Sequence, residues 1–434
     1  MSAFAYDGIV LVEGVRTPFV KAGGPFARVS AAELGRLAIS ELLARTGFDP
    51  AKIDEVIMGN CGTPPDTANI ARVAALEAGV PASVPAFTVH RNCASGIESI
   101  AEAAARIAAG RASAVIAGGT ESMSNYPLMM GPRLTEAFAA SSRGRSPIAR
   151  LAPFTRLRGP DLAPRIAIME GLTDPVSGLN MGETAEVLAR EFRISREAQD
   201  AFALLSHQRT VAAADEGRLA AETMIVYPAP KFEPVSADVG PRREQTLEQL
   251  AKLKPFFDRR NGTVTVGNSC PITDGAAAML VMSEEAAAAE GYVPLGRLRA
   301  VAFAGLEPER MGLGPVYATP LALDAAGVTL ADMKLIEMNE AFAAQVLANL
   351  QAFASADFAR EKLGRPGGAV GAIDPDKLNV NGGAIALGHP VGVSGTRIVL
   401  TLLKELERRG GGLGLATLCI GGGQGAAVIV EVAK

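Results

Sequence analysis

One α/β pattern occurs twice in this chain, once in its first third and once in its last third. In both places, short apolar runs rich in β-branched residues alternate with Ala-rich segments whose apolar residues recur at helical spacing. This alternation is typical of a sheet that helices cover on both faces, so we predict an α/β fold. The predicted strands are residues 9–12, 55–58, 114–117, 335–338, 413–418 and 426–430, and the predicted helices are residues 31–44, 97–109 and 396–408.

The repetition includes the small residues that flank these elements. Residues 92–96 (Asn-Cys-Ala-Ser-Gly) open a predicted helix, which is followed by a strand and by Gly118 and Gly119. Residues 393–395 (Val-Ser-Gly) also open a predicted helix, which is followed by a strand and by three glycines at 421–423. The chain is therefore predicted to be a fused duplication, and a site at the junction of two such halves can take residues from both.

Length and charge exclude several classes of protein. The chain has 434 residues, 48% of them hydrophobic, which is enough for a large buried core. The 42 Lys and Arg residues nearly balance 46 Asp and Glu residues, which excludes a chain-wide basic surface for nucleic acid. No apolar run approaches the roughly 18 residues of a membrane span, and the first residues lack the basic start of a signal peptide. We expect a soluble, cytoplasmic protein.

Positive charge is concentrated in one segment, residues 131–165. This segment holds seven arginines against two acidic residues, and the arginines are interleaved with Ile148, Leu151, Phe154 and Leu157. It is either a solvated loop or a surface that docks an acidic ligand, a partner subunit or a membrane. The residues alone leave these alternatives open.

The four cysteines are far apart in the sequence, and the chain has only three histidines. Because no CxxC pair and no cluster of Cys and His is present, we predict neither a zinc site nor a disulfide framework. Cys93 lies between an apolar run and a long helical pattern. The free N–H groups at a helix N-terminus favour a thiolate and lower the pKa of a nearby Cys. On this evidence Cys93 is either a nucleophile or a buried structural residue.

Two Gly-rich clusters add residues with acid-base chemistry. Residues 381–395 place five glycines and one proline around His389, which predicts an irregular loop that approaches a ligand closely. His389 is the best candidate for a general base, since we expect His90 in the core and His207 on a helix surface. Cys419 precedes the glycines at 421–423, whose backbone N–H groups can face an anion while the thiol transfers protons.

Together these segments closely resemble the thiolase family over nearly the whole chain. The resemblance implies a duplicated five-layered αβαβα fold with an inserted loop domain. It also implies homodimers or homotetramers that use acyl-CoA and coenzyme A (CoA) as substrates, with no metal and no permanently bound cofactor. The motifs that carry it are residues 92–96 (Asn-Cys-Ala-Ser-Gly), 118–124 (Gly-Gly-Thr-Glu-Ser-Met-Ser), 339–342 (Asn-Glu-Ala-Phe), 388–395 (Gly-His-Pro-Val-Gly-Val-Ser-Gly) and 419–423 (Cys-Ile-Gly-Gly-Gly).

The predicted segments follow from this resemblance and from the less regular pattern in the middle of the chain. Residues 1–123 form the N-terminal α/β half, which about residues 256–290 complete. Residues 124–255 form the inserted loop domain, and residues 291–434 form the C-terminal α/β half.

The resemblance also implies roles for individual residues. Cys93 is the nucleophile, His389 is its activating base, and Cys419 is the acid and base at the substrate α-carbon and the incoming thiol. Asn339 holds a water that forms one oxyanion hole together with His389. The backbone N–H groups of Cys93 and Gly421 form the other, since two carbonyl oxygens must carry negative charge in succession.

The residues expected to bind acyl-CoA depart in part from the family pattern. Many thiolases have His where this chain has Asn180. The Arg-rich segment resembles the thiolase subunits of fatty-acid oxidation complexes, which usually have His in place of Asn339. The residues assigned to the substrate are Arg242 at the nucleotide end of CoA, Ser269 or Cys270 at the pantetheine, and Met181, Met311 and Phe342 in the acyl pocket.

The predicted activity is CoA-dependent thiolytic cleavage of 3-oxoacyl-CoA, as in fatty acid β-oxidation, or the reverse Claisen condensation. Both directions pass through an acyl group on Cys93. Two alternatives are a 3-ketoacyl synthase, which needs two histidines beside its Cys, and a catalytically silent acyl-CoA-binding subunit. The second alternative predicts that acyl-CoA does not label Cys93.

Overall fold

A computed structural model describes residues 2–433, whose strands form one 11-stranded sheet and a separate two-stranded ribbon. The strands of the large sheet are β1 (Ser2–Ala5), β2 (Ile9–Arg16), β3 (Val20–Lys21), β4 (Glu55–Gly59), β5 (Ala86–Val89), β6 (Ala114–Ser122), β9 (Thr273–Ser283), β10 (Gly296–Gly305), β11 (Met333–Met338), β12 (Gly412–Ile420) and β13 (Gln424–Val432). Their order is β11-β12-β13-β10-β2-β9-β6-β4-β5, with β1 paired to β10 and β3 paired to β9.

The sheet confirms the predicted duplication. In the N-terminal half β4 runs parallel to β6, β6 antiparallel to β9, and β9 antiparallel to β2. In the C-terminal half β11 runs parallel to β12, β12 antiparallel to β13, and β13 antiparallel to β10. The two sets of four strands therefore have the same order and the same directions. They join where Gly296 and Arg297 of β10 pair with Leu11 and Val10 of β2.

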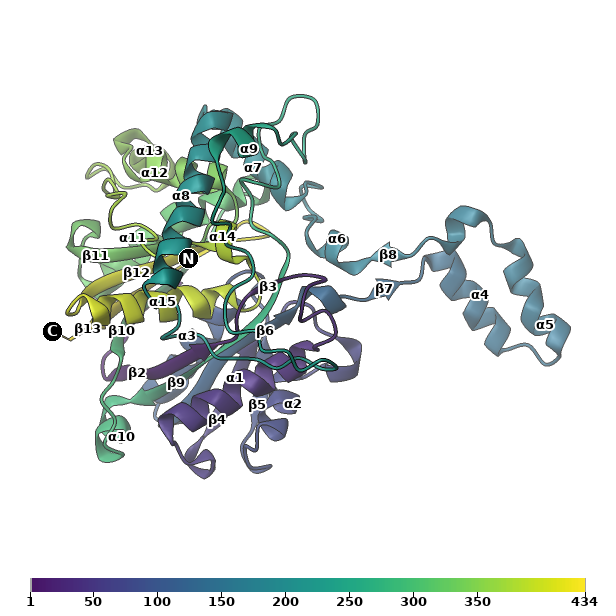
Figure 1. Cartoon of the computed structure of the whole chain (residues 1–434), viewed down its shortest axis with the longest axis horizontal. Coiled ribbons are helices and arrows are strands. Elements are labelled where there is room, and N and C mark those ends of the chain that lie inside the picture. The colour runs from purple at the N-terminus through teal and green to yellow at the C-terminus, as the bar shows by residue number, and fades with distance from the viewer. Residues whose placement is uncertain (1, 434) are drawn as a thin grey trace.

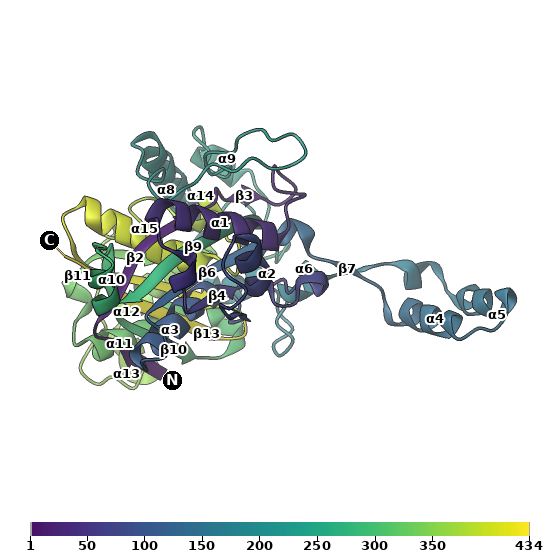
Figure 2. The same ribbon diagram turned by 90° about the horizontal axis from the view of Figure 1, so that it is seen from below.

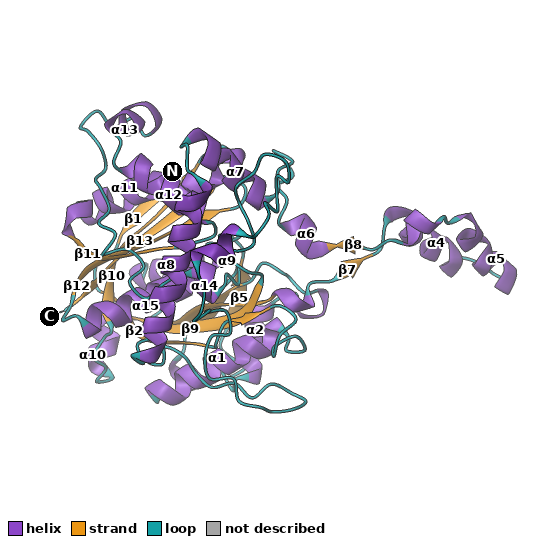
Figure 3. Ribbon diagram, turned by 45° about the horizontal axis from the view of Figure 1, so that its top comes forward, coloured by secondary structure: helices purple, strands orange, loops and turns teal. Residues whose placement is uncertain are grey.

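Helices lie outside both halves of the sheet and between them, which gives the five layers expected (Figures 1 and 3). The helices α1 and α2 pack on the outer face of the N-terminal half, and α11 and α12 pack on the outer face of the C-terminal half. The helices α3 and α15 lie between the halves. These six helices are α1 (Ala31–Thr46), α2 (Ile70–Glu77), α3 (Ser95–Ala108), α11 (Gly314–Ala326), α12 (Ala343–Phe353) and α15 (Ser394–Arg408).

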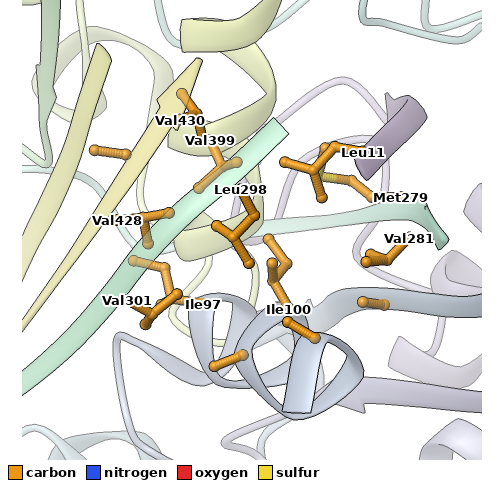
Figure 4. Packing of buried hydrophobic residues seen from close by; sticks show 14 of the residues in the cluster. Leu11, Ile97, Ile100, Met279, Val281, Leu298, Val301, Val399, Val428 and Val430 are labelled. Atoms are coloured by element: carbon orange, nitrogen blue, oxygen red, sulfur yellow. The ribbon is translucent and has the colours of Figure 1, made fainter. Parts of the chain in front are cut away.

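The central core lies between the two halves and includes residues from both (Figure 4). Ile97 and Ile100 of α3 and Val399 of α15 pack with Met279 of β9 and Val428 of β13. The strands are buried on both faces, as in β9, where ten of the eleven residues are buried. This burial explains why the strands are continuous apolar runs and not alternating ones. The predicted strands and helices are all present, with ends that differ by a few residues.

The segment that departs from this plan is an arm, defined here as residues 128–166. Figures 1 and 2 show it extending away from the body in both views. Its base is a ribbon in which Leu128 pairs with Ile166 and Met129 pairs with Arg165. Beyond this ribbon, Phe138 of α4 and Phe154 make an edge-to-face contact with ring centroids 5.0 Å apart. The elements of the arm are β7 (Leu128–Met129), α4 (Pro132–Ser142), α5 (Pro147–Leu151) and β8 (Arg165–Ile166).

The chain returns from the arm through α6 (Ala167–Gly171) to helices that cover the strand ends where the candidate site lies. These helices are α7 (Met181–Glu191), α8 (Arg196–Asp215), α9 (Leu247–Ala251) and α14 (Ala384–Leu387). Two further helices, α10 (Glu284–Ala289) and α13 (Ala356–Lys362), lie at the periphery (Figure 1).

Candidate active site

The N-termini of α3 and α15 touch each other at the junction of the two halves. A Cβ on Gly96 would lie 2.6 Å from the backbone nitrogen of Thr396, and a Cβ on Gly395 would lie 2.5 Å from that of Ile97. Only glycine permits this approach, which is why each helix motif contains one. Cys93 precedes α3 and His389 precedes α15, so the contact brings the two loops together.

Cys93 lies on the tight turn between β5 and α3. Asn92 adopts a left-handed backbone conformation (φ 44°), which Asn tolerates better than most residues. Its side-chain Nδ2 donates a hydrogen bond of 2.8 Å to the carbonyl oxygen of Gly421. Residues from the two halves are thus tied together directly beside the Cys93 thiol.

The thiol of Cys93 is protonated at rest, which corrects the expectation of a lowered pKa. Burial raises the pKa of Cys93, although hydrogen bonds from the backbone N–H groups of Gly421 and of Cys93 itself lower it. Burial outweighs the helix N-terminus here because desolvation disfavours a thiolate. A base must therefore remove the proton, while the two N–H groups remain directed at the reacting atom.

His389 is the candidate for that base. It is 6% exposed, and its Nδ1 lies 2.5 Å from Ser394 Oγ, which is also 3.2 Å from the carbonyl oxygen of Pro390. A hydroxyl has one proton, so Ser394 donates to Pro390 and accepts the Nδ1–H of His389. The Nε2 of His389 is then an acceptor, and it has no protein partner among residues 2–433. Burial and the nearby Arg397 lower the pKa of His389 to about 4, so the imidazole is neutral.

Cys419 is the last residue but one of β12, lies in an apolar cluster and is 1% exposed. Burial and the neighbouring thiols of Cys93 and Cys270 raise the pKa of Cys419 well above its usual value. The same factors, burial and the nearby Cys93, raise the pKa of Cys270 to about 12. Three cysteines from distant parts of the sequence therefore lie around one site, each protonated at rest.

Asn339 contributes an unpaired amide to the same region. It is fully buried, and neither its Nδ2 nor its Oδ1 has a hydrogen-bond partner within the described chain. Its backbone N–H donates to the carbonyl of Thr417, two residues before Cys419. Buried amides are almost always hydrogen-bonded, so this side chain is suited to bind a polar ligand atom or a water.

Met181, Met311 and Phe342, the residues predicted to line the acyl pocket, all belong to the apolar cluster around Cys419. A Cβ on Gly421 would lie 3.1 Å from the Met181 sulfur, so Met181 covers the backbone of Gly421. Asn180 has a structural use, since its Oδ1 accepts the N–H of Gly182 and caps α7.

Cys270 and Ser269 differ in their surroundings. Cys270 packs beside Cys419 in the apolar cluster, and the backbone N–H of His389 approaches the carbonyl of the next residue, Pro271, at 3.5 Å. Ser269 is buried, and its Oγ donates to the carbonyl of Thr265 at 2.7 Å. Cys270 therefore lies beside Cys419, whereas the hydroxyl of Ser269 is already paired with the backbone.

Arg242 lines a surface cavity of about 390 Å³ together with Glu244, Gln245, Gln249 and Leu253. Its guanidinium donates to Gln245 Oε1 at 3.3 Å and, within residues 2–433, has no carboxylate partner. The loop that carries Arg242 packs on the segment before His389. The contact is so close that a Cβ on Gly240 would lie 2.1 Å from the carbonyl oxygen of Ala386.

The expectations for the other two histidines are wrong. His90 is exposed, because β5 is the edge strand of the sheet and the chain leaves it toward solvent. His207 is buried, because the loop at Arg242 covers α8, and its Nδ1 accepts the backbone N–H of Arg242 at 3.2 Å. Of the three histidines, His389 is the one that is both buried and carried by the loop that the contact between α3 and α15 brings to the Cys93 turn, whereas a 3-ketoacyl synthase needs two.

Within residues 2–433 no three His, Cys, Asp or Glu side chains gather in a way that would hold a metal ion. None of the helices described there is both long enough and apolar enough to cross a membrane.

Comparison with known proteins gives a consistent picture. The family described as "Thiolase, N-terminal domain" matches residues 9–285, and "Thiolase, C-terminal domain" matches residues 292–432. The chain is 48% identical to a 3-ketoacyl-CoA thiolase of Yersinia pestis (strain Pestoides F) over 427 residues, which cover 98% of this chain and 97% of that protein. Among solved structures, it is similar to the Bacillus anthracis acetyl-CoA acetyltransferase (TM-score 0.86, 37% identity, 99% of each chain). It is also similar to human mitochondrial 3-ketoacyl-CoA thiolase in complex with CoA (TM-score 0.85, 38% identity, 100% of each chain).

Proposed function

The chain belongs to the thiolase family, and we propose that it performs thiolysis of 3-oxoacyl-CoA through an acyl group carried by Cys93. It is an acyltransferase that uses CoA as a co-substrate. The observation that supports the assignment of residues is that the contact between α3 and α15 brings the loops of Cys93 and His389 together, while the Cys93 thiol neighbours Cys419. Transfer of an acetyl group from acetyl-CoA to Cys93, measured by mass spectrometry of the intact protein and its peptides, tests this assignment.

The first half-reaction begins with transfer of the Cys93 proton to Nε2 of His389. The thiolate then attacks the 3-keto carbonyl, and the backbone N–H groups of Cys93 and Gly421 receive the negative oxygen. When this intermediate collapses, the bond between C2 and C3 breaks and the acyl group stays on Cys93. The electron pair goes to the acetyl-CoA fragment as an enolate, whose oxygen accepts hydrogen bonds from His389 Nε2–H and Asn339, directly or through a water.

Cys419 protonates this enolate at C2, which releases acetyl-CoA. Its raised pKa suits the task, because the thiol keeps its proton until a carbanion is present. In the second half-reaction, the Cys419 thiolate takes the proton of the incoming CoA thiol. The CoA sulfur attacks the thioester, Cys93 leaves as a thiolate, and the proton on His389 returns to it. Each residue ends in its initial state.

Arg242 is proposed to bind the negatively charged nucleotide end of CoA. We expect Arg242→Ala to raise the KM for CoA about three- to tenfold and to leave kcat within about twofold, since a contact made equally in ground and transition states gives uniform binding. Steady-state kinetics at low ionic strength measure this. The matched control is Arg243→Ala, because the Arg243 guanidinium already pairs with Asp215 at 2.5 Å. Equal KM values for both variants would remove Arg242 from the CoA site.

The arm is proposed to bind an anionic membrane surface. Arg150, Arg156 and Arg158 have no carboxylate partner among the described residues, and exposed apolar side chains such as Ile148 and Leu151 accompany them. Basic residues beside exposed apolar ones suit a surface of anionic lipid. Because the arm extends away from the body, a membrane can contact the arm without contacting the sheet (Figure 2).

Charge reversal of these three arginines to Glu is expected to abolish sedimentation with vesicles of anionic lipid and to leave catalysis in solution within about twofold of wild type. Vesicle sedimentation at two salt concentrations measures the binding. The control reverses three exposed charges on the body, Arg28, Arg111 and Lys231, for the same change in net charge. Sedimentation that survives in the arm variant would exclude these arginines as the membrane-binding surface, and capture of a partner subunit by the wild-type arm alone would favour protein docking.

Homo-oligomers are proposed as well. Their support in this chain is the edge strand β5, all four residues of which are only partly buried. An open strand edge is commonly covered by another chain.

A further inference from the structure

Glu121, at the end of β6, is a fully buried carboxylate that no step above uses. Its Oε2 accepts the backbone N–H groups of Cys61 and Gly392, each at 2.9 Å. Its Oε1 accepts the backbone N–H of Gly62 at 2.9 Å and the side-chain Nδ2 of Asn60 at 3.1 Å. One side chain therefore holds two loops that are more than 300 residues apart in the sequence.

Each of these loops leads to a proposed catalytic residue. Gly392 lies between Pro390 and Ser394, the two residues that orient the His389 imidazole. On the other side, the Cys61 thiol donates to the carbonyl oxygen of Asn92 at 3.2 Å, directly before Cys93.

A close backbone contact supports the same arrangement. A Cβ on Gly119 would lie 2.0 Å from the carbonyl oxygen of Gly392, so β6 and the His389 loop are in direct contact beside Glu121.

We propose that Glu121 is the positioning residue that holds Cys93 and His389 at reacting distance. The inference rests on the roles proposed for these two residues. The carboxylate links the halves at their junction, where each supplies one reactive group, and a displacement of either loop would separate Cys93 Sγ from His389 Nε2. A displacement of about 1 Å is enough to slow such a reaction about 100-fold.

The negative charge of Glu121 is required because every group around it is a donor. The donors are three backbone N–H groups, Asn60 Nδ2 and the Tyr126 hydroxyl, which also hydrogen-bonds this carboxylate. In the wild-type protein each carboxylate oxygen accepts two N–H groups. In Glu121→Gln the amide NH₂ would therefore face two N–H donors in either orientation. At least one of the two loops would lose a hydrogen bond to this side chain whichever way the amide turned.

The test compares Glu121→Gln with Asp54→Asn. Asp54 is a matched control, because its carboxylate accepts the backbone N–H groups of Ser113 and Ala114 at the opposite end of the same strand. The readouts are the rate constant for alkylation of Cys93 by iodoacetamide between pH 6 and 10, confirmed by peptide mapping, and thermal unfolding. Steady-state KM for CoA is measured beside them.

In Glu121→Gln we expect alkylation of Cys93 at pH 7 to slow about 10- to 100-fold, its pH midpoint to rise, and KM for CoA to stay within about twofold. The midpoint rises because a thiolate that has lost its imidazolium partner is less stable. In Asp54→Asn only the unfolding temperature should fall. If Glu121 had only a structural role, Glu121→Gln would lower the unfolding temperature without moving the pH midpoint of Cys93 alkylation.

A folded Glu121→Gln protein with the alkylation rate and pH midpoint of wild type overturns the inference. If this variant does not fold, Cys61→Ala removes the thiol link to Asn92 and leaves the backbone contacts of Glu121 intact. We then expect alkylation of Cys93 to slow several-fold, and an unchanged rate overturns the inference. If acetyl-CoA does not acetylate Cys93 in the wild-type protein, the proposed function itself is overturned. Failure of the proposed function is thus distinguished from failure of the role inferred for Glu121.

Discussion

Cys93→Ser is expected to lower the rate of thiolysis at least about 10³-fold while the protein remains folded. The substitution changes one atom at a partly buried position, so we expect the free energy of unfolding to stay within about 1 kcal/mol of wild type. A hydroxyl is a far weaker acid than a thiol. His389, with a pKa lowered to about 4, is too weak a base to activate it.

Three measurements check this expectation: steady-state thiolysis of a 3-oxoacyl-CoA, mass spectrometry after incubation with acetyl-CoA, and thermal unfolding. The wild-type protein provides the internal control, because peptides with the other cysteines, Cys61, Cys270 and Cys419, should remain unmodified. More than a few per cent of wild-type turnover in a folded Cys93→Ser protein would remove Cys93 from the role of nucleophile.

Cys419→Ala is expected to separate the two half-reactions. Acylation of Cys93 by acetyl-CoA needs the nucleophile, His389 and an oxyanion hole, so the variant should still form an acetyl-enzyme. Proton transfer at the substrate α-carbon needs an acid and base on the other side of the substrate, which is Cys419 in our assignment. The variant should therefore lose thiolysis at least about 10³-fold, together with exchange of the acetyl-CoA α-hydrogens with deuterated water.

His389→Ala is the complementary variant, because the loss of the base should slow acylation of Cys93 itself. Mass spectrometry of the acetylated protein and NMR of deuterium exchange distinguish the two patterns, with thermal unfolding to establish that both variants fold. Undiminished deuterium exchange in Cys419→Ala would show that another group performs the chemistry at the α-carbon, and the mechanism would have to be revised.

The fold was predictable because its signals are local and repeated. Buried strands are continuous apolar runs in this chain, and glycines mark the ends of equivalent elements in both halves. The juxtaposition of Cys93 with His389 follows from the same regularity, since the motifs around Gly96 and Gly395 open equivalent helices that meet at the junction. The boundaries given for the three segments stay a prediction.

Properties that depend on burial were not predictable from residue order. The helix N-terminus suggested a lowered pKa for Cys93, whereas desolvation raises it. His90 and His207 exchanged their expected environments because an edge strand exposes one and a distant loop covers the other. The part played by Ser394 beside His389 was missed as well, although its place at the start of a helix after the His389 loop was a usable signal.

The same limit applies to contacts between distant loops. Glu121 lies within the motif of residues 118–124, but only the structure shows that its carboxylate accepts the backbone N–H groups of both Cys61 and Gly392. The irregular middle of the chain gave no sign that residues 128–166 extend outward as an arm (Figure 1). Irregular segments lack the periodicity from which direction and packing can be inferred.

The central place of β2 has a consequence for how the chain is made. This strand lies far ahead of its neighbours in the sheet along the chain, since β9 and β10 begin only at Thr273 and Gly296. Residues 9–12 are fully buried in the finished protein, and they must wait unpaired while most of the chain is synthesised. Such long-range pairing slows folding and leaves apolar strand exposed to aggregation. Until β9 and β10 emerge from the ribosome, β2 of the nascent polypeptide is therefore open to non-native contacts, and we expect its protection by chaperones to raise the yield of folded protein.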